Sequence, residues 1–358
     1  MLSFFKDKKV FLTGHTGFKG AWVLQILHLA GAKVKGFSLA PTNDLDLFNQ
    51  IQGEQLCESS IIEDVRNAKR VQEELLSFEP DFVFHLAAQA LVRESYDCPQ
   101  FTFETNVMGT IHILEALRQW EKKCTAILIT TDKVYENLET KRAFVETDKL
   151  GGHDPYSASK AACEIAISSY RNSFFSKDEY AKHQKIIHAL RAGNVIGGGD
   201  FSKDRIIPDI VRAIENEQPV VLRNPKAVRP WQHVLEPLFT YLEIAERSHK
   251  KPYSLADAYN IGPNQENVAD VEFLTQQFIS FFGKGEYRVE GNHKQPHEAQ
   301  FLMLDNALLK KDLNWQPMYD TESTIRITAE WYADQTHTAL EKCHFQIEKF
   351  YAQWKATV

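Results

Sequence analysis

The feature that most constrains the fold of this chain is a strand that leads through a glycine-rich turn into a helix. Lys9–Thr13 is predicted to form a buried strand and Phe18–Ala30 a helix, with Gly14, Gly17 and Gly20 at the junction. In such turns the first glycine permits a tight bend, the second lets the backbone approach a pyrophosphate, and the third allows close helix–strand contact. The helix N-terminus adds N–H groups and a positive dipole. The segment therefore predicts a dinucleotide-binding site, although its glycine spacing is one residue longer than the usual fingerprint.

Strand-like and helix-like segments alternate through the first half of the chain. Further strands are predicted at Lys33–Leu39, Asp81–His85, Ala126–Thr131 and Ile186–Arg191, together with a short strand that ends at Ile62. Helices are predicted at Ala68–Phe78, Phe103–Trp120 and Tyr156–Phe175. This alternation predicts an α/β fold, a doubly wound parallel sheet of the Rossmann type with helices on both faces. We assign residues 1–190 to this dinucleotide-binding domain and expect the chain to return to it near residues 230–262.

The composition of the sequence and its pattern of predicted strands and helices change after Arg191. Residues 193–200 are rich in glycine, prolines punctuate the following stretch, and the strand–helix alternation becomes irregular. We interpret residues 191–335 as a smaller, mixed lobe that binds the substrate and is interleaved with the first domain. Residues 336–358 are predicted to form a helical tail.

Composition excludes several classes of function. The chain has 358 residues, 25% of them charged, and a net charge of −7, which argues against a nucleic acid or an anionic membrane as partner. No apolar run approaches the roughly 20 residues that span a bilayer. The five cysteines are widely spaced and show no metal-ligand pattern, so we expect a cytoplasmic protein without a metal site.

A tyrosine and a lysine at helical spacing predict oxidoreductase chemistry. Tyr156 and Lys160 lie four residues apart in a predicted helix and so share one face. A nearby ammonium favours the phenolate form of a tyrosine, whose ordinary pKa is about 10. Tyr156 is therefore a plausible base for taking a proton from a hydroxyl during hydride transfer.

The acid expected about 20 residues after the glycine turn, which would hold the ribose of NAD, is missing. The second predicted strand ends around Ser38, with neither a carboxylate nor an arginine for a 2′-phosphate. NAD and NADP are therefore not distinguished by this element. Asp64 and Val65, after the third strand, are candidates for the adenine end, and Asp64 is equally well explained as a helix-start acid.

Several motifs together resemble the extended short-chain dehydrogenase/reductase superfamily. They are Gly14–Gly20, His85–Gln89, Asn106, Thr131–Asp132 and the pair Tyr156 and Lys160. A second set is similar to the nucleotide-sugar 4,6-dehydratases that act on CDP-D-glucose: Thr16–Gly20, Ala90–Tyr96, Asp132–Asn137, Gly151–Tyr156, Arg191–Asp200 and His297–Ala299. The resemblance extends from about residue 5 to residue 335.

The resemblance implies NAD as cofactor and a set of residues to bind it. These are Gly14, His15, Thr16, Gly17, Phe18, Gly20, Asp64, Val65, Leu86, Ala87, Ala88, Asn106, Tyr156 and Lys160. It also implies a reaction in which oxidation at carbon 4 of the sugar permits loss of the 6-hydroxyl, after which the hydride returns to carbon 6. The product would be a 4-keto-6-deoxy sugar formed without net oxidation.

The implied catalytic residues are Thr131, Asp132, Lys133, Tyr156 and Lys160. Thr131 resembles the residue that hydrogen-bonds the 4-oxygen, and Asp132 resembles the acid that protonates the departing 6-hydroxyl. Lys133 departs from the dTDP-glucose branch, which has a glutamate at this position as the base for carbon 5. A lysine can be that base only when neutral; otherwise it could stabilise the enolate while another group removes the proton.

Substrate contacts and assembly are further expectations. The resemblance implies that the sugar nucleotide, CDP-glucose, is bound by Ser95, Thr131, Asn194, Arg205, Arg229 and His297. Helices 103–120 and 156–175 carry apolar residues on more than one face, which predicts either a homodimer or homotetramer, or burial inside a larger monomer. The sequence is also compatible with a dehydratase or 4-epimerase that acts on a UDP- or dTDP-sugar, and with a non-catalytic dinucleotide sensor.

Overall fold

The computed structural model describes residues 1–140, 142–290 and 301–357. The chain folds into two compact units, each assembled from three stretches of chain. The first, called the sheet unit, comprises residues 1–136, 149–191 and 238–259. The second, called the lobe unit, comprises residues 137–148, 192–237 and 260–358.

A seven-stranded sheet with the strand order β11-β6-β5-β4-β1-β2-β3 organises the sheet unit. Its strands are β1 (Lys9–Thr13), β2 (Lys33–Ser38), β3 (Ser59–Ile62), β4 (Phe82–His85), β5 (Cys124–Ile129), β6 (Lys185–Ala192) and β11 (Ala258–Ile261). Neighbours from β3 to β6 pair in parallel. The order reverses between β1 and β4, where doubly wound sheets bind their ligands. The predicted Rossmann fold is confirmed.

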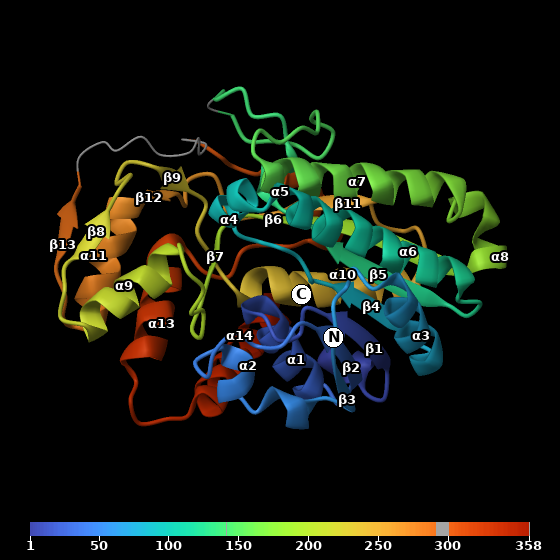
Figure 1. Ribbon diagram of the computed structural model, residues 1–358, viewed down its shortest axis with the longest axis horizontal. Coiled ribbons are helices and arrows are strands. Elements are labelled where there is room, and N and C mark those ends of the chain that lie inside the picture. Colours follow the sequence, from blue (N-terminus) through green and yellow to red (C-terminus); the bar gives the residue numbers. More distant parts are fainter. Residues whose placement is uncertain (141, 291–300, 358) are drawn as a thin grey trace. The chain divides into compact units, whose positions relative to one another are not determined.

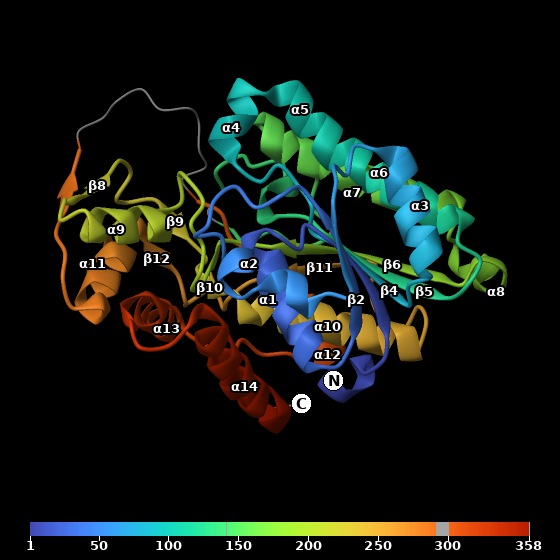
Figure 2. The same ribbon diagram turned by 60° about the horizontal axis from the view of Figure 1, so that its bottom comes forward.

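Helices cover both faces of this sheet (Figures 1 and 2). One face carries α3 (Ala68–Phe78), α6 (Gly109–Gln119) and α7 (Pro155–Ser173), and the other carries α1 (Phe18–Leu29) and α10 (Leu235–Lys250). Shorter helices are α2 (Leu47–Gln50), α4 (Val92–Asp97), α5 (Pro99–Phe103) and α8 (Tyr180–His183), with single turns at Leu2–Phe5, Gly53–Leu56, Glu104–Met108, Asp132–Val134 and Lys177–Glu179. Because both faces are covered, β4, β5 and β6 are buried along their whole length.

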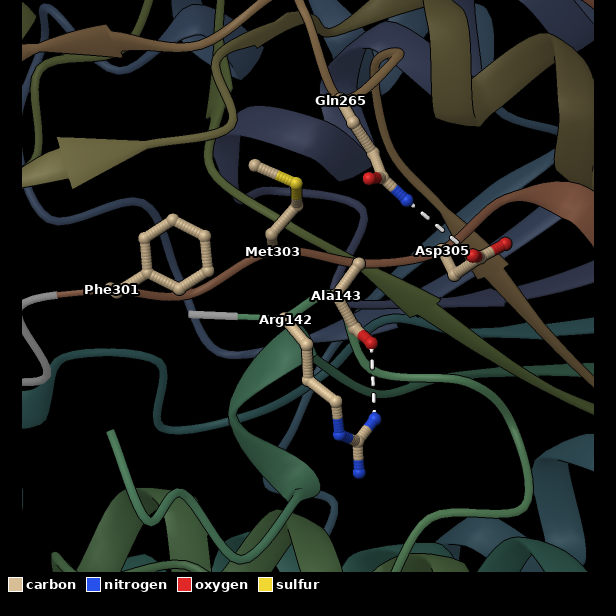
Figure 3. Close-up of a pocket in the computed structure, with 6 residues that line it drawn as sticks. All are labelled: Arg142, Ala143, Gln265, Phe301, Met303 and Asp305. Carbon is tan, nitrogen blue, oxygen red and sulfur yellow. Dashed lines mark hydrogen bonds between the residues drawn. The ribbon is translucent and has the colours of Figure 1, made fainter. Parts of the chain in front are cut away.

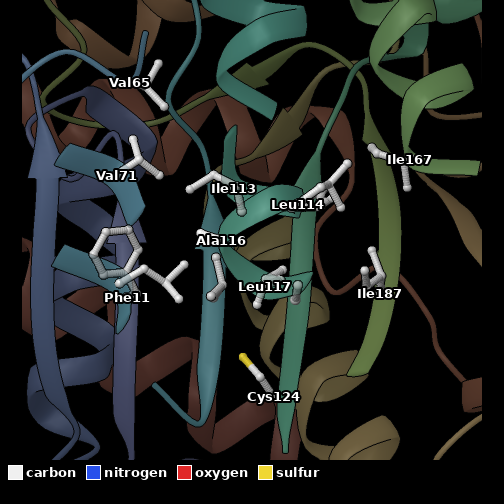
Figure 4. Packing of buried hydrophobic residues seen from close by; sticks show 14 of the residues in the cluster. Phe11, Val65, Val71, Ile113, Leu114, Ala116, Leu117, Cys124, Ile167 and Ile187 are labelled. Carbon is white, nitrogen blue, oxygen red and sulfur yellow. The ribbon is translucent and has the colours of Figure 1, made fainter. Parts of the chain in front are cut away.

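The core beneath α3, α6 and α7 joins apolar residues of the sheet to those of the helices (Figure 4). The strands contribute Phe11, Val83, Ala126, Leu128 and Ile187, and the helices contribute Val71, Leu75, Ile113, Leu114, Leu117 and Ile167. Burial of this apolar surface, at roughly 25 cal/mol per Å², holds the helices on the sheet.

Strand register brings the ends of four strands to one level. Thr13 pairs with His85, His85 with Leu128, and Leu128 with Ala189. Because these strands are parallel, the segments that follow them leave the sheet at the same edge. The glycine turn, residues 86–89 and residues 130–135 therefore emerge from one edge of one sheet.

One predicted helix is built differently. The sequence predicts a single helix over residues 103–120. In the structure the helical segment begins at Pro99, with α5, and a π turn at Glu104–Met108 separates α5 from α6. The π turn adds one residue to the helical repeat. Asn106 within it is buried and bonds the backbone of Gln89, a contact that the apolar pattern could not indicate.

The lobe unit combines short strands with five helices in the described residues. Its helices are α9 (Ile206–Glu215), α11 (Val271–Phe282), α12 (Ala307–Leu313), α13 (Thr321–Ala333) and α14 (Ala339–Thr357). Its strand pairs are β7 (Val195–Ile196) with β10 (Gln232–His233), β8 (Val220–Leu222) with β13 (Tyr287–Val289), and β9 (Val228–Arg229) with β12 (Ala269–Asp270). Two pairs are parallel and one is antiparallel, so this unit is mixed. Across residues 1–140, 142–290 and 301–357, no helix has the length and apolar character needed to cross a bilayer.

Replacing a residue of this core tests the packing. Leu114 of α6 is fully buried, so Leu114→Ala is expected to lower the free energy of unfolding by about 2–5 kcal/mol through lost burial and the cavity that remains. Leu45→Ala, at a leucine that is 56% exposed, should change it by less than about 0.5 kcal/mol. Urea unfolding followed by circular dichroism measures both, and equal values would contradict the assignment of Leu114 to the core.

Candidate active site

The glycine turn joins β1 to α1 through contacts that leave no room for a side chain at Gly14 or Gly20. Gly14 has a φ of +73°, and a Cβ there would lie 2.7 Å from the backbone nitrogen of Ala87. A Cβ on Gly20 would lie 1.9 Å from the carbonyl oxygen of Gly14, so α1 packs directly on the turn. Gly17 is exposed, and a Cβ there would make only an ordinary 3.5 Å contact. Packing does not require a glycine at position 17, which fits a position kept open for a phosphate.

The N-terminus of α1 is suited to an anion. Gly17 precedes the helix, and no side chain caps it there. The first N–H groups of a helix have no acceptor within it, and helical bonding begins when the nitrogen of Ala21 donates to the oxygen of Gly17. The positive end of this helix therefore favours a phosphate at that place.

The side chains of His15 and Thr16 point into the protein. The ring of His15 lies 2.7 Å from the hydroxyl of Ser60, and Gly36 leaves space for it, since a Cβ there would lie 2.4 Å from the ring. Burial lowers the pKa of His15 to about 4, so the ring is neutral near pH 7. Thr16 donates to the carbonyl oxygen of Leu39 and therefore accepts from the hydroxyl of Ser38, 2.8 Å away. A cofactor would meet these two residues mainly through their backbone.

Asp64 and Val65 follow β3 and differ in surroundings. The Asp64 carboxylate accepts from the backbone nitrogen of Arg66 at 2.8 Å and from its guanidinium at 2.7 and 2.9 Å. Partial burial acts to raise the pKa of Asp64, but the bonds and charge of Arg66 outweigh it and hold that pKa below its usual value. Val65 is 5% exposed and packs in the core beside Gly109.

The segment after β4 lies against the glycine turn. Leu86, Ala87 and Ala88 are half-buried. The backbone nitrogen of Leu86 donates to the carbonyl oxygen of Thr13, and that of Ala87 donates to its hydroxyl, each at 3.2 Å. The structure thus brings together two of the segments predicted to hold the cofactor.

A buried histidine connects this edge to α6. His85 Nδ1 lies 2.7 Å from Thr13 Oγ1, and His85 Nε2 lies 3.2 Å from Thr110 Oγ1. Thr110 donates to the carbonyl oxygen of Asn106 at 2.7 Å, so Nε2 must carry the histidine proton and Thr13 must donate to Nδ1. Burial, with a smaller effect from the charge of Lys160, lowers the pKa of His85 to about 3 and keeps this arrangement neutral.

Two predicted site residues use their side chains inside the protein. Asn106 accepts from the nitrogen of Gln89 at 2.9 Å and donates to its oxygen at 3.0 Å and to the hydroxyl of Ser159 at 2.8 Å. Ser95 is fully buried and donates to the carbonyl oxygen of Val92 at 2.6 Å, within α4. In this arrangement both side chains stabilise the segments around the site.

The three predicted catalytic residues after β5 form one polar cluster. Thr131 donates from its hydroxyl to Asp132 Oδ1 at 2.9 Å, and Lys133 Nζ lies 3.2 Å from the same oxygen. The Asp132 side chain is 1% exposed and that of Lys133 is 20% exposed. Asp132 Oδ2 is buried and has no hydrogen-bond partner among the described residues. The cluster therefore holds one carboxylate oxygen and leaves the other available to a ligand.

The start of α7 places Tyr156 and Lys160. Pro155 occupies the first turn, and Asp154 caps the helix by accepting from the nitrogen and hydroxyl of Ser157 at 2.9 and 2.6 Å. Tyr156 is 8% exposed and Lys160 is 6% exposed. The local sequence therefore fixes where the helix begins and which residues share its first turns.

Lys160 joins this helix to the end of β5. Its Nζ donates to the carbonyl oxygen of Ile129 at 3.1 Å, just before the loop that carries Asp132. Burial lowers the pKa of Lys160, although the charges of Cys163 and Glu164 oppose the shift. The structure thus brings Tyr156 and Lys160 next to the Thr131–Lys133 cluster. Glu164, missed by sequence reasoning, could have been found by its spacing of four residues from Lys160.

The predicted substrate residues after Arg191 lie in the lobe unit. Arg205 donates to Asp200 Oδ2 at 2.9 Å, and Arg229 is 4% exposed and donates to the carbonyl oxygen of Val228 at 2.9 Å. Asn194 is half-buried, beside β7. His297 lies outside the described residues.

A surface hollow of about 400 Å³ lies elsewhere in the lobe unit (Figure 3). Its lining residues are Arg142, Ala143, Gln265, Phe301, Met303 and Asp305, and none of them is a predicted site residue. Arg142 donates to both carboxylate oxygens of Asp148, at 2.7 and 2.8 Å, and to the carbonyl oxygen of Ala143. The guanidinium is therefore already occupied within the protein.

Solved structures of nucleotide-sugar enzymes share this fold. The structure of dTDP-glucose 4,6-dehydratase from Bacillus anthracis in complex with NAD matches with a TM-score of 0.74 at 20% identity, over 92% of this chain and 97% of that one. UDP-glucose 4-epimerase from Thermus thermophilus in complex with NAD matches with a TM-score of 0.76 at 23% identity, over 92% and 100%. At these identities the likeness establishes the fold alone.

Sequence comparison identifies the family. A family model described as GDP-mannose 4,6 dehydratase matches residues 11–328. CDP-glucose 4,6-dehydratase from Salmonella typhimurium is 41% identical over 330 residues, which are 92% of each chain. A dTDP-glucose 4,6-dehydratase from Xanthomonas campestris is 24% identical over 339 residues, 90% of this chain and 92% of that one. This chain belongs to the GDP-mannose 4,6-dehydratase family, and the resemblance found in its motifs is confirmed.

Two glycine substitutions separate packing from ligand binding. Gly20→Ala is expected to destabilise the protein by about 1–3 kcal/mol or more, because its Cβ meets a backbone oxygen that cannot move aside. Gly17→Ala should lower stability by under about 1 kcal/mol, the size of a weakened helix cap, yet reduce affinity for NAD⁺. Thermal unfolding without ligand and titration with NAD⁺ measure the two effects. Unchanged NAD⁺ affinity in Gly17→Ala would remove the phosphate role from this turn.

Proposed function

We propose that this protein is a CDP-D-glucose 4,6-dehydratase, which converts CDP-glucose to CDP-4-keto-6-deoxy-glucose. The observation that carries the proposal is the contact of Lys160 with Ile129, which sets the Tyr156–Lys160 pair beside Asp132. A tyrosine–lysine pair suits oxidation at carbon 4, and a buried carboxylate suits the loss of water that follows. The 41% identity to a CDP-glucose 4,6-dehydratase over 92% of the chain favours this nucleotide sugar.

NAD is the proposed cofactor, and the residues of the sheet unit fit it. Its phosphates would lie on the N-terminus of α1, where Gly17 is exposed and uncapped. Asp64 would contact the adenine end, and Tyr156 and Lys160 the nicotinamide ribose. When bound, NAD⁺ would supply the hydride acceptor for oxidation at carbon 4 and the hydride donor for reduction at carbon 6.

The side chains of the protein would move the protons at carbon 4. Tyr156 takes the proton of the 4-hydroxyl, helped by the ammonium of Lys160, which favours the phenolate. Thr131 would hydrogen-bond the 4-oxygen. The single proton of the 4-hydroxyl goes to Tyr156, so Thr131 would bond the 4-oxygen as a donor, by turning its hydroxyl away from Asp132, its acceptor in this structure.

Asp132 and Lys133 would carry out the dehydration. Oδ1 of Asp132 is bonded by Thr131 and Lys133, so Oδ2 is the oxygen that would carry a proton, with Asp132 as the neutral acid, and donate it to the departing 6-hydroxyl. Lys133 can remove the proton of carbon 5 only as a neutral amine. As an ammonium it would stabilise the enolate, and another group would remove that proton.

The lobe unit would hold the sugar nucleotide. We assign this role to Asn194, Arg205, Arg229 and His297 on the strength of the family resemblance. Arginine suits a diphosphate because its guanidinium donates two parallel hydrogen bonds. Arg229 is 4% exposed, whereas the side chain of Arg205 is 34% exposed, and Arg229 donates to the carbonyl oxygen of Val228. We therefore expect Arg229 to be the more rigid of the two.

The proposed reaction suggests a cellular role. We propose that the enzyme acts in the cytoplasm and supplies 3,6-dideoxyhexose synthesis for lipopolysaccharide O-antigen. All five cysteines are free thiols, as a reducing compartment would keep them.

A test of the function follows the hydrogen of carbon 4. CDP-glucose carrying deuterium at that carbon, with a catalytic amount of NAD⁺, should give a 4-keto product with deuterium at carbon 6 of the same molecule. Mass spectrometry and NMR measure this, and dTDP- and UDP-glucose tested alongside should react more slowly. Tyr156→Phe should lower kcat by at least about 100-fold, as expected for loss of a general base, whereas Tyr180→Phe should not.

Three different results would each identify a different protein. Loss of the deuterium to solvent, or release of one NADH per sugar, would show an ordinary dehydrogenase. A sugar inverted at carbon 4 without a keto group would show an epimerase. Binding of NAD⁺ without turnover of any of the three sugars would favour a sensor.

We also infer a homodimer through α5, α6 and α7. Within each chain, Ile113, Leu114, Leu117 and Ile167 are buried in the core, so only the outer faces of these helices remain for a partner. Apolar side chains are exposed on these helices, Phe103 at 39% and Ile165 at 61%, and directly next to them, Met108 in the π turn at 43% and Phe174 after α7 at 44%. A second copy of this chain presenting the same faces would cover them.

Sedimentation tests the dimer. The wild type at micromolar concentration should show twice the chain mass of 41.1 kDa, and Ile165→Asp should shift it to the single-chain mass by placing a charge in the apolar contact. Phe345→Asp, at a residue of α14 that is 67% exposed, serves as the control and should not change the mass. A wild type of single-chain mass would contradict the dimer, and four times that mass would indicate a second interface.

A further inference from the structure

A buried guanidinium lies next to the candidate site but outside the proposed chemistry. Arg191, near the end of β6, is 5% exposed. Its Nε and Nη2 donate to the two carboxylate oxygens of Glu164, each at 2.9 Å. Its Nη1 donates to the hydroxyl of Tyr135 at 2.6 Å, and the guanidinium lies 5.1 Å from the centre of that ring. One buried cation thus contacts two elements of the site.

Glu164 supplies the partner charge from α7. Tyr156, Lys160 and Glu164 follow one another at intervals of four residues and so line one face of this helix. Glu164 is 5% exposed and accepts from the hydroxyl of Thr130 at 2.5 Å. The carboxylate is therefore bonded both to Arg191 and to the loop that begins after β5.

Thr130 and Tyr135 bracket the turn that carries the catalytic cluster. Thr130 precedes Thr131, and Tyr135 follows the turn Asp132–Val134 directly. Both bracketing side chains are buried, Thr130 at 6% and Tyr135 at 2% exposed. Thr130 is bonded to Glu164 and Tyr135 to Arg191, so the two ends of the turn are attached to the two members of one ion pair.

We propose that the Arg191–Glu164 pair is a positioning device for the reaction. It fixes the turn carrying Asp132 against the helix carrying Tyr156 and Lys160, and it neutralises a carboxylate that would otherwise compete for the Lys160 ammonium. The proposal rests on the proposed function. Arg191 and Glu164 act through these neighbours and have no contact with the reacting atoms.

The charge balance explains why both members are needed. Removing one partner of a buried pair leaves the other as an uncompensated buried charge. Burial lowers the pKa of Lys160, while Cys163 and Glu164 raise it. Other titratable groups interact electrostatically with these residues: His85 on β4 with Lys160, Arg171 on α7 with Glu164 and Arg191, and Tyr241 on α10 with Tyr156. Arg191 is the cation that bonds both oxygens of Glu164 and so balances its charge.

The sign of the effect follows from the charge left behind. In Arg191→Met the carboxylate of Glu164 is unpaired and disfavours the phenolate of Tyr156, two helical turns away. At about 12 Å and an effective dielectric constant of about 20, one charge raises the pKa of Tyr156 by about one unit. Because the base must be ionised, the acidic limb of the kcat–pH profile should move to higher pH by the same amount.

The experiment compares Arg191→Met with the double variant Arg191→Met/Glu164→Gln. Arg191→Met should lower kcat about 10- to 100-fold, the range for a catalytic group displaced by up to about 1 Å, with little change in KM for CDP-glucose. The double variant lacks the unpaired charge of Glu164, so the acidic limb of its kcat–pH profile should return toward the wild-type position. Tyr135→Phe, which removes one hydroxyl, should lower kcat without moving the limb.

A matched control uses a half-buried ion pair away from the site. Lys35 on β2 and Glu74 on α3 are 2.8 Å apart, with side chains 13% and 14% exposed. Lys35→Met should lower stability without changing kcat or the acidic limb of the kcat–pH profile.

If Arg191→Met does not fold, Arg191→Lys takes its place. This variant keeps the charge but loses the paired bonds, so it should lower kcat without moving the acidic limb of the kcat–pH profile.

A second measurement is independent of the sugar. The ionisation of Tyr156, followed by NMR of 13C-labelled tyrosine and assigned with Tyr156→Phe, should shift upward in Arg191→Met and return in the double variant. This titration reports on the ion pair even when the wild type fails to turn over CDP-glucose, which would be a failure of the proposed function alone. The positioning role is overturned if Tyr156 titrates alike in the wild type, in Arg191→Met and in the double variant, or if neither Arg191→Met nor Arg191→Lys loses more activity than Lys35→Met.

Discussion

The structure depends on the register of its parallel strands. Thr13, His85, Leu128 and Ala189 stand in one row across β1, β4, β5 and β6. Parallel strands end together only when their register is fixed, and a slip of one residue would turn every buried side chain to the opposite face. Here the apolar residues beneath α3, α6 and α7 hold the register. The polar segments that follow the strands consequently meet at a single edge.

At that edge several polar side chains are bonded within the protein before any ligand arrives. His15 is packed against Ser60, Asn106 is bonded to Gln89, and His85 is bonded to Thr13 and Thr110. Each buried polar group left without a partner would be destabilising by about 1–3 kcal/mol. The side chains closest to the glycine turn therefore shape the site, while exposed backbone is what remains for a dinucleotide.

The buried charges of the site show the opposite arrangement. Lys160 is held by a carbonyl oxygen, and Asp132 keeps one carboxylate oxygen without a partner in the described residues. Glu164 and Arg191 are bonded to each other and lie outside the proposed chemistry. Asp132, the proposed acid, keeps one oxygen for the substrate, whereas Glu164 and Arg191 are paired with each other and hold the segments around it, so stability and reactivity are separated between neighbouring residues.

The sequence alone determined the features that depend on near neighbours along the chain. The turn at Gly14–Gly20, the shared helix face of Tyr156 and Lys160, and the alternation of strands and helices were all predictable because each is encoded within a short segment. The burial of His15, the bonds of Asn106 and the pairing of Glu164 with Arg191 were not predictable. Their partners lie 45, 17 and 27 residues away in sequence, and only strand order and register decide which distant residues meet.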